Sequence, residues 1–86
     1  IDLLRGVDDV PFGPIDVRLA ERLLILAGNQ KEIQTTHQLL AGELGTAREV
    51  ISRVLHDFQR RAMILQSRGR ITLQDKPALK KLSTLG

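Results

Sequence analysis

A tight turn at Leu44-Gly45-Thr46-Ala47 is the feature that most constrains how this chain can fold. Two helices joined by about three or four residues need a sharp bend, and glycine tolerates the strained backbone of such a bend. Before the turn, Thr35 or Thr36 can cap a helix that ends at Leu44. After the turn, Thr46 can cap a long helix over residues 47–61, whose apolar residues recur at a helical spacing. The sequence therefore predicts a helix-turn-helix.

The helix predicted over residues 47–61 has two opposite faces. At roughly 100° per residue, the apolar face holds Ile51, Val54, Leu55 and Phe58. The other face carries Arg48, Glu49, Ser52, Arg53 and His56. That second face is expected to be exposed, and its residue types are those that read base edges in the major groove of DNA. Arginine offers two donors to guanine, a carboxylate accepts from the amino group of cytosine, and serine contacts a base or a phosphate.

Glu49 is the most informative residue of the polar face. Beside phosphates a carboxylate is unfavourable unless it meets a donor on a base, so a plain basic patch does not need one between Arg48 and Arg53. The alternative interpretation is a solvent-exposed i,i+4 pair of Glu49 with Arg53, which contributes about 0.2–0.5 kcal/mol to helix stability. The position directly after a glycine turn favours DNA reading over that alternative.

Charge is divided unevenly along the chain. Residues 1–47 hold four basic and seven acidic side chains, a net charge of −3, whereas residues 48–86 hold nine basic and three acidic ones, a net charge of +6. The positive part contains the two-faced helix, which indicates a polyanion as partner. A basic surface that faces only solvent is the alternative that charge leaves open.

The remaining elements complete a small fold. A first helix is predicted from Asp16, whose carboxylate can cap it, to its end at Gly28. Further elements are expected along the chain: a short extended piece at residues 33–35, hairpin arms at residues 64–66 and 70–73, and a last helix opened by Asp75 and Pro77. This order predicts a mainly α fold with a small β-hairpin wing, a winged helix-turn-helix.

The length of 86 residues fits one small domain, predicted over residues 16–86. Aromatic residues make up only 2% of the chain, so the core is expected to be aliphatic. Residues 1–15 contain Gly6, Pro11 and Gly13 and are predicted to be a short apolar tail and a linker. The chain starts at Ile1 without a methionine, so either a piece of a longer protein or an unusual numbering of the chain is expected.

The segment from Thr36 to Ile64, THQLLAGELGTAREVISRVLHDFQRRAMI, resembles the C-terminal DNA-binding domain of the Crp/Fnr transcription regulators. The typical pattern of that family is T-x-x-x-[LI]-[AG]-x-x-[LV]-G-x-[ST]-R-E-x-[VI]-[SG]-R. The preceding PIDVRLAERLLILA and the following GRITLQD are similar to the family's first helix and wing. The resemblance covers nearly the whole chain from about Val10.

This resemblance implies contacts for particular residues. The family's base-contacting positions correspond to Arg48, Glu49 and Arg53, and Ser52 corresponds to a further one in the Fnr-type subgroup. Thr36 corresponds to a contact with a backbone phosphate at the start of the second helix. From their place around Gly69 at the tip of the hairpin, Arg68 and Arg70 are expected to hold phosphates as well.

The resemblance also implies partners. These are double-stranded DNA with a palindromic operator, a second copy of the protein in a homodimer, and RNA polymerase. Family members pair through a long helix ahead of this domain, and Ile1 to Gly6 are expected to be its last turn. They sense a ligand or a redox state in an upstream β-barrel, so no cofactor is expected in this domain itself. A cytoplasmic location is expected, in keeping with a chain that has no cysteine.

Three residues depart from the family pattern. Ala47 stands where a serine often binds phosphate, and Leu39 stands at a position that is commonly polar. Ala62 stands where glycine or asparagine usually ends the long helix in a left-handed conformation, which costs alanine roughly 1 kcal/mol.

Other functions find little support in the residues. His37 and His56 are the only imidazoles and lack the neighbours of a zinc site, so no metal is expected. Ser52, His56 and Asp57 do not make a hydrolase site, because Asp57 lies a further 100° round the helix, so no catalytic residue is assigned. No apolar run approaches the roughly 20 residues that span a bilayer, so no membrane partner is expected. The main alternative is a winged-helix protein-interaction module that reads no bases.

Overall fold

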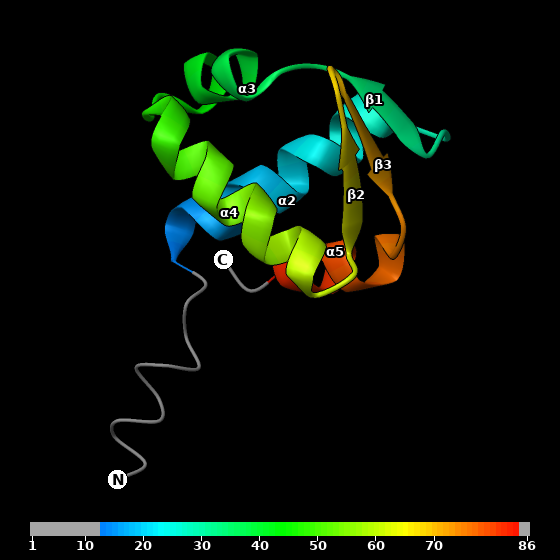
Figure 1. The fold of residues 1–86 in the computed structure, drawn as a ribbon. Coiled ribbons are helices and arrows are strands. Elements are labelled where there is room, and N and C mark those ends of the chain that lie inside the picture. The colour runs from blue at the N-terminus through cyan, green and yellow to red at the C-terminus, as the bar shows by residue number, and fades with distance from the viewer. Residues whose placement is uncertain (1–12, 85–86) are drawn as a thin grey trace, which may run out of the picture.

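The computed structural model describes residues 13–84 and shows a mainly helical fold with one small sheet (Figure 1). The elements, in chain order, are α2 (Pro14–Ala27), β1 (Glu32–Gln34), α3 (His37–Leu44), α4 (Arg48–Arg60), β2 (Ile64–Ser67), β3 (Arg70–Leu73) and α5 (Lys76–Ser83). The predicted winged helix-turn-helix order is confirmed. The predicted turn of a dimerisation helix at residues 1–6 lies outside the described residues.

The first helix begins earlier than predicted. Its N-cap is Gly13, whose carbonyl accepts from the N–H groups of Asp16 at 3.1 Å and Val17 at 3.3 Å. The prediction that Asp16 caps this helix is therefore wrong. Pro14 has a fixed φ and no N–H to leave unpaired, so it suits the first helical position. Asp16 consequently lies inside the first turn and is buried.

The helix-turn-helix closes through Gly45, as predicted. Gly45 has the left-handed φ of 70°, and the N–H of Thr46 donates to the carbonyl of Ala41 at 3.0 Å, which closes the end of α3. The prediction that Thr46 caps α4 is wrong, because Ala47 is its N-cap and has no side chain that can accept a hydrogen bond. The long helix therefore covers Arg48–Arg60 rather than 47–61.

Local caps at two other helices are confirmed. The Oγ1 atom of Thr36 accepts from the N–H of Leu39 at 3.1 Å at the start of α3. Asp75 accepts from the N–H of Ala78 at 3.1 Å at the start of α5. Ala62 follows α4 with a φ of +63°, as the comparison with the family pattern predicted, and the N–H of Met63 closes the helix on the carbonyl of Phe58 at 3.0 Å.

The hairpin of β2 and β3 is joined by β1 into one antiparallel sheet in the order β1-β3-β2. Ile71 in the central strand pairs with Ile33 on one side and with Gln66 on the other. Arg68 and Gly69 form the two-residue tip, and Gly69 supplies the positive φ of 67° that such a turn needs. The short extended piece predicted at residues 33–35 is thus a real strand, displaced by one residue.

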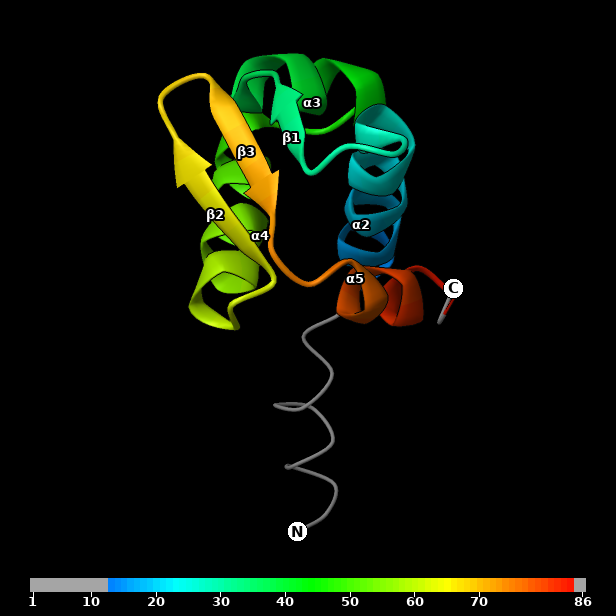
Figure 2. The ribbon, with the colours of Figure 1, turned by 90° about the vertical axis from the view of Figure 1, so that its right-hand side faces the viewer.

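The core lies between the sheet and the helices. Figure 2 shows β2 and β3 in front of α4, with β1 beside β3 and in front of α3, and with α5 against α2. Each helix and strand contributes at least one buried apolar side chain, and Phe58 is the one aromatic side chain of this core within residues 13–84. Within the same residues, no helix is both long and apolar enough to cross a membrane. The packing fixes α4 with its apolar face inward.

Candidate nucleic-acid interface

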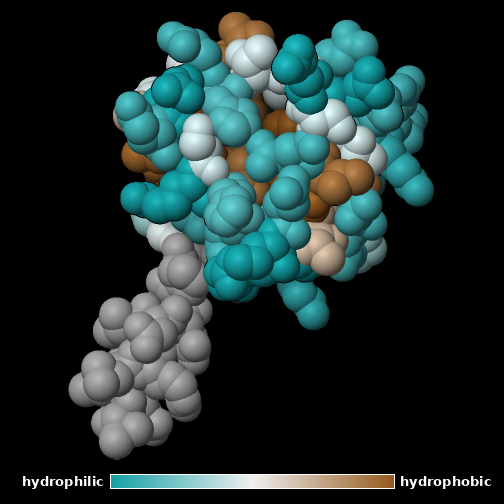
Figure 3. Space-filling view, in the orientation of Figure 1, coloured by the Kyte–Doolittle hydropathy of each residue, from teal (hydrophilic) through white to brown (hydrophobic). Residues whose placement is uncertain are grey.

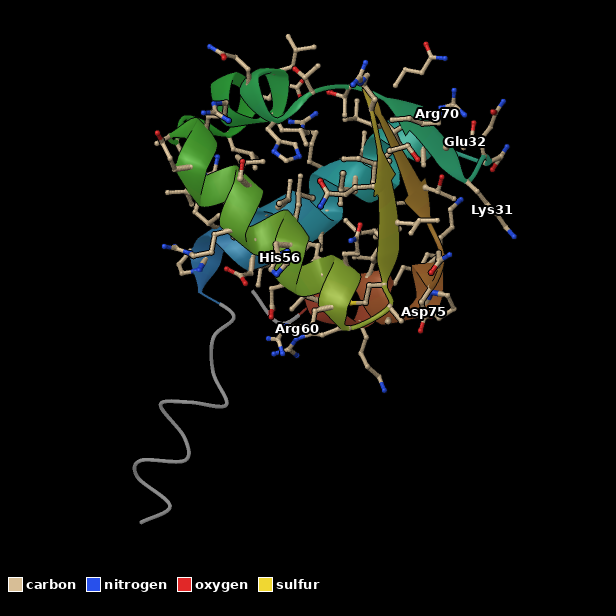
Figure 4. The ribbon with its side chains drawn as sticks, viewed as in Figure 1. Lys31, Glu32, His56, Arg60, Arg70 and Asp75 are labelled. Carbon is tan, nitrogen blue, oxygen red and sulfur yellow. The ribbon has the colours of Figure 1, made fainter. Side chains whose placement is uncertain are left out.

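The polar face of α4 is exposed. Arg48, Glu49, Arg53 and His56 are all solvent-exposed, whereas the side chains opposite them, Ile51, Val54, Leu55 and Phe58, are buried. Figure 4 shows α4 running across the front of the molecule with His56 on it, and in the same orientation this front is mostly hydrophilic (Figure 3). The orientation predicted for the two-faced helix is therefore confirmed.

Glu49 and Arg53 do not neutralise each other. Within residues 13–84, the ion pairs join Arg22 to Glu43, Arg60 and Arg61 to Asp57, and Arg70 to Glu32, and none joins Glu49 to Arg53. The proposed i,i+4 pair is thus absent from the structure. Neither charge is therefore neutralised by the other.

Ser52 differs from its neighbours because it is half-buried and hydrogen-bonded within the domain. Its Oγ lies 2.7 Å from Nδ1 of His37, the first residue of α3. The Nε2 atom of His37 lies 2.7 Å from Oε1 of Gln66 on β2. One imidazole therefore connects the second helix, the exposed helix and the wing.

The residues predicted to hold phosphates line one hollow. Thr36, Arg68 and Arg70 border a space of about 410 Å³ between the start of α3 and the tip of the hairpin, together with His37 and Gln66. The structure thus brings the three predicted phosphate residues together. It also places them next to the imidazole that contacts Ser52.

These three residues have different surroundings. The hydroxyl of Thr36 caps α3, so one of its acceptor positions is used inside the domain. Arg70 lies 3.6 Å from Glu32 on the adjacent strand, and Figure 4 shows the two side by side at the end of the sheet. Arg68 is exposed at the hairpin tip. An exposed ion pair such as that of Arg70 is weak and can be exchanged for a phosphate at little cost.

A second, smaller hollow of about 230 Å³ lies at the opposite edge of α4 and is lined by Asp16, Arg53, Val54 and Asp57. Burial raises the pKa of the Asp16 carboxyl, and the charge of Asp57 raises it further, while hydrogen bonds from the backbone and the charge of Arg53 partly oppose the rise. Asp57 is itself held by Arg60 at 2.6 Å and by Arg61 at 3.1 Å. Arg53 therefore lies beside two carboxylates, those of Asp16 and Asp57, at this edge of α4.

The sequence does not predict the contacts of His37 with Ser52 and Gln66. From the sequence, metal binding is the one role for which His37 is a candidate, and the part of the chain that the structure describes holds no group of three His, Cys, Asp or Glu residues that could bind a metal ion. His37 is 15 residues from Ser52 and 29 from Gln66 in the sequence, so no local pattern predicts their contact. Only the folding of the wing back onto α3 brings them together.

The fold and this exposed face define a class of protein, the winged helix-turn-helix. Residues 17–82 match the model of the Crp-like helix-turn-helix domain, and the chain belongs to this family. Solved structures similar to it include a transcriptional regulator of the CRP family, and this chain matches the family's helix-turn-helix domain.

Solved structures agree with this assignment. A protein of the Crp/Fnr family from Eubacterium rectale is 33% identical, with a TM-score of 0.81, and the match covers 96% of this chain and 39% of that one. A CRP-family transcriptional regulator from Thermus thermophilus is 28% identical, with a TM-score of 0.77 and coverage of 84% and 41%. The Catabolite Activator Protein of Thermus thermophilus is 26% identical, with a TM-score of 0.77 and coverage of 96% and 40%.

The chain thus spans 39–41% of the length of these three structures. No curated protein sequence matches it significantly.

Proposed function

We propose that this domain reads the sequence of double-stranded DNA by placing α4 in the major groove. Arg48 and Arg53 would donate to guanine, Glu49 would accept from cytosine, and Ser52 would contact a neighbouring base. Thr36, Arg68 and Arg70 would hold the sugar-phosphate backbone from the hollow beside the wing.

One observation carries the proposal. An exposed carboxylate lies between two exposed arginines and pairs with neither within residues 13–84, on a helix whose other face is buried. A surface built only to attract a polyanion gains nothing from that carboxylate, whereas a base reader does. The hollow with its arginines adjoins α4 through His37, which lines the hollow and contacts Ser52, so base and backbone contacts can form together.

The proposal extends to the assembly. Two copies of the domain would read a palindrome whose half-sites lie about one helical turn apart, as is usual for dimeric helix-turn-helix proteins. The resemblance to the Crp/Fnr family adds RNA polymerase as a proposed partner and a sensor domain upstream of this chain. One half-site contributes only part of the affinity, so an isolated copy binds more weakly than a dimer.

Selection of bound duplexes from a random pool tests the proposal. The expected result is a shared half-site rich in G·C pairs at the positions that face Arg48, Glu49 and Arg53. Glu49→Gln is the matched variant, because it keeps the size of the side chain and removes the acceptor-only carboxylate. The cytosine preference should weaken in this variant, while binding to random DNA should rise slightly. Bound duplexes without any shared sequence would contradict base reading.

A protein-docking module is the alternative, and the 58% exposed Leu39 on α3 is the feature that favours it. A docking module would show neither a base preference nor a steep dependence on salt when duplex DNA is added. Calorimetry against one selected and one random duplex, each at two salt concentrations, separates the two functions.

A further inference from the structure

His37 is held between two partners of different hydrogen-bonding character. The oxygen Oε1 of Gln66 carries no proton, so at 2.7 Å it can only accept, and Nε2 of His37 must be the donor. In the neutral imidazole only one ring nitrogen carries a proton, so Nδ1 is then the acceptor.

Because Nδ1 of His37 is an acceptor, it determines which hydrogen-bonding groups of Ser52 remain for another partner. A serine hydroxyl has one proton and two lone pairs. At 2.7 Å from a bare Nδ1, the hydroxyl of Ser52 donates its proton inward to His37. Only lone pairs of Oγ then remain for a partner outside the domain.

We propose that His37 is a positioning residue that makes Ser52 a hydrogen-bond acceptor toward DNA. In the major groove, adenine and cytosine present amino groups that donate, whereas guanine and thymine present acceptors. Ser52 therefore selects adenine or cytosine at the base that it faces. This inference rests on the proposed function, since it assumes that α4 enters the major groove.

Because Gln66 lies on β2, the proposed orientation of the Ser52 hydroxyl depends on the wing. The backbone N–H of Gln66 donates to Oε1 of Gln59 on α4 at 2.8 Å, so β2 is fixed to the same helix that carries Ser52. Gln66 on β2 therefore determines that Nε2 of His37 carries the proton, although β2 itself contacts no base in this proposal. Detachment of the wing releases the imidazole and, through it, the hydroxyl of Ser52.

Nitrogen-15 NMR of the free 86-residue chain tests, without DNA, which ring nitrogen of His37 carries the proton. At a pH where the ring is neutral, long-range proton–nitrogen correlations distinguish a protonated ring nitrogen from a bare one. The expected result for His37 is a protonated Nε2 and a bare Nδ1. A protonated Nδ1 would overturn the proposal, because Ser52 would then keep its own proton for the DNA.

Selection from a random pool tests the consequence for specificity. With His37→Leu, the hydroxyl of Ser52 can rotate and donate, so discrimination for adenine or cytosine at that one position should fall about two- to tenfold, the range of one hydrogen bond. Preferences at the positions read by Arg48, Glu49 and Arg53 should remain. Leu39→Gln, at an exposed position of the same helix, is the control and should leave every preference unchanged.

A double-mutant cycle shows whether His37 acts through Ser52. The combined His37→Leu and Ser52→Ala variant should discriminate at this position no worse than Ser52→Ala alone. Additive losses would overturn the proposal, as would an unchanged base preference in His37→Leu. If the wild-type chain itself selects no sequence, the proposed function fails instead. The NMR result still decides whether Ser52 donates its proton to His37.

Discussion

The Oε1 atom of Gln59 on α4 accepts a hydrogen bond of 2.8 Å from the backbone N–H of Gln66 on β2. The exposed helix and the wing are thus joined directly as well as through His37. Gln59→Ala should lower the free energy of unfolding by about 0.5–1.5 kcal/mol, since it leaves one strand N–H without this partner. Urea unfolding measures the change. Gln74→Ala is the control, because that exposed side chain makes no hydrogen bond within residues 13–84, and it should stay within about 0.5 kcal/mol of the wild type.

Ala62 has a backbone conformation that favours glycine. Its φ of +63° costs alanine about 1–2 kcal/mol, whereas glycine loses roughly 0.5–1 kcal/mol through its greater freedom in the unfolded chain. Ala62→Gly should therefore raise the free energy of unfolding by up to about 1 kcal/mol. Thermal and urea unfolding both report the gain.

Gly45→Ala is the matched opposite of that change. An added Cβ at Gly45 meets no atom within 4 Å, so any effect comes from its φ of +70° alone. The free energy of unfolding should fall by up to about 1 kcal/mol, because the lower freedom of alanine in the unfolded chain offsets part of the left-handed strain. A destabilised Ala62→Gly variant together with a tolerated Gly45→Ala variant would contradict the argument from backbone conformation.

Asp16 should make the domain less stable as pH rises. Burial raises its pKa in the folded state above the ordinary value of 3.8, so the folded state holds the proton more tightly than the unfolded chain. The stability that this proton provides is fully present below 3.8 and is lost as pH rises through the folded-state pKa. Asp16→Asn, which stays neutral, should gain stability relative to the wild type as pH rises above 3.8. Urea unfolding at several pH values checks the direction, and a relative gain that shrinks with rising pH would contradict it.

Thr36 has a structural and a proposed binding role that can be separated. Thr36→Ala removes the acceptor for the N–H of Leu39 and should lower the free energy of unfolding by about 1 kcal/mol. Thr36→Asp keeps a capping oxygen and should remain as stable as the wild type, but its negative charge lies in the hollow with Arg68 and should weaken DNA binding. Equal DNA affinity of Thr36→Asp and the wild type would remove this residue from the backbone contacts.

Arg53 and Arg68 should differ in how they support DNA binding. Arg53→Ala should weaken binding to a selected duplex by about 1–3 kcal/mol and reduce the preference at one position. Arg68→Ala should weaken binding to all duplexes alike and lower the slope of log affinity against log salt by about 1. Titrations on selected and random duplexes at several salt concentrations measure both effects. Parallel losses on both duplexes for both variants would refute the distinction between base and backbone contacts.

Local signals in the sequence predicted most of the fold. Gly45 ends α3 and Asp75 caps α5 as expected, since each acts on groups within a few residues of itself. The exposed face of α4 followed from periodicity, because one face of a helix in a small domain has to be buried. Helix starts were less well predicted. Gly13 and Ala47 are the N-caps of α2 and α4 although Asp16 and Thr46 offered better side-chain caps, because the position of a helix in the core outweighs the energy of one cap.

The connection between helices and wing could not be predicted in this way. His37 meets Ser52 and Gln66 only after the hairpin has folded against α3, and a histidine in a first helical turn has no pattern that indicates such partners. The hollow that gathers Thr36, Arg68 and Arg70 has the same origin. Residue types indicated the chemistry, and tertiary packing determined which of the residues act together.

The first and the last helix of the described chain pack against each other, with Leu19 and Leu23 of α2 and Leu79 of α5 all fully buried. An eight-residue helix such as α5 is too short to persist alone in water, so it depends on α2 for its existence. Loss of either helix would expose the leucines of the other to solvent. The domain should therefore lose its structure in one cooperative step rather than fray inward from one terminus.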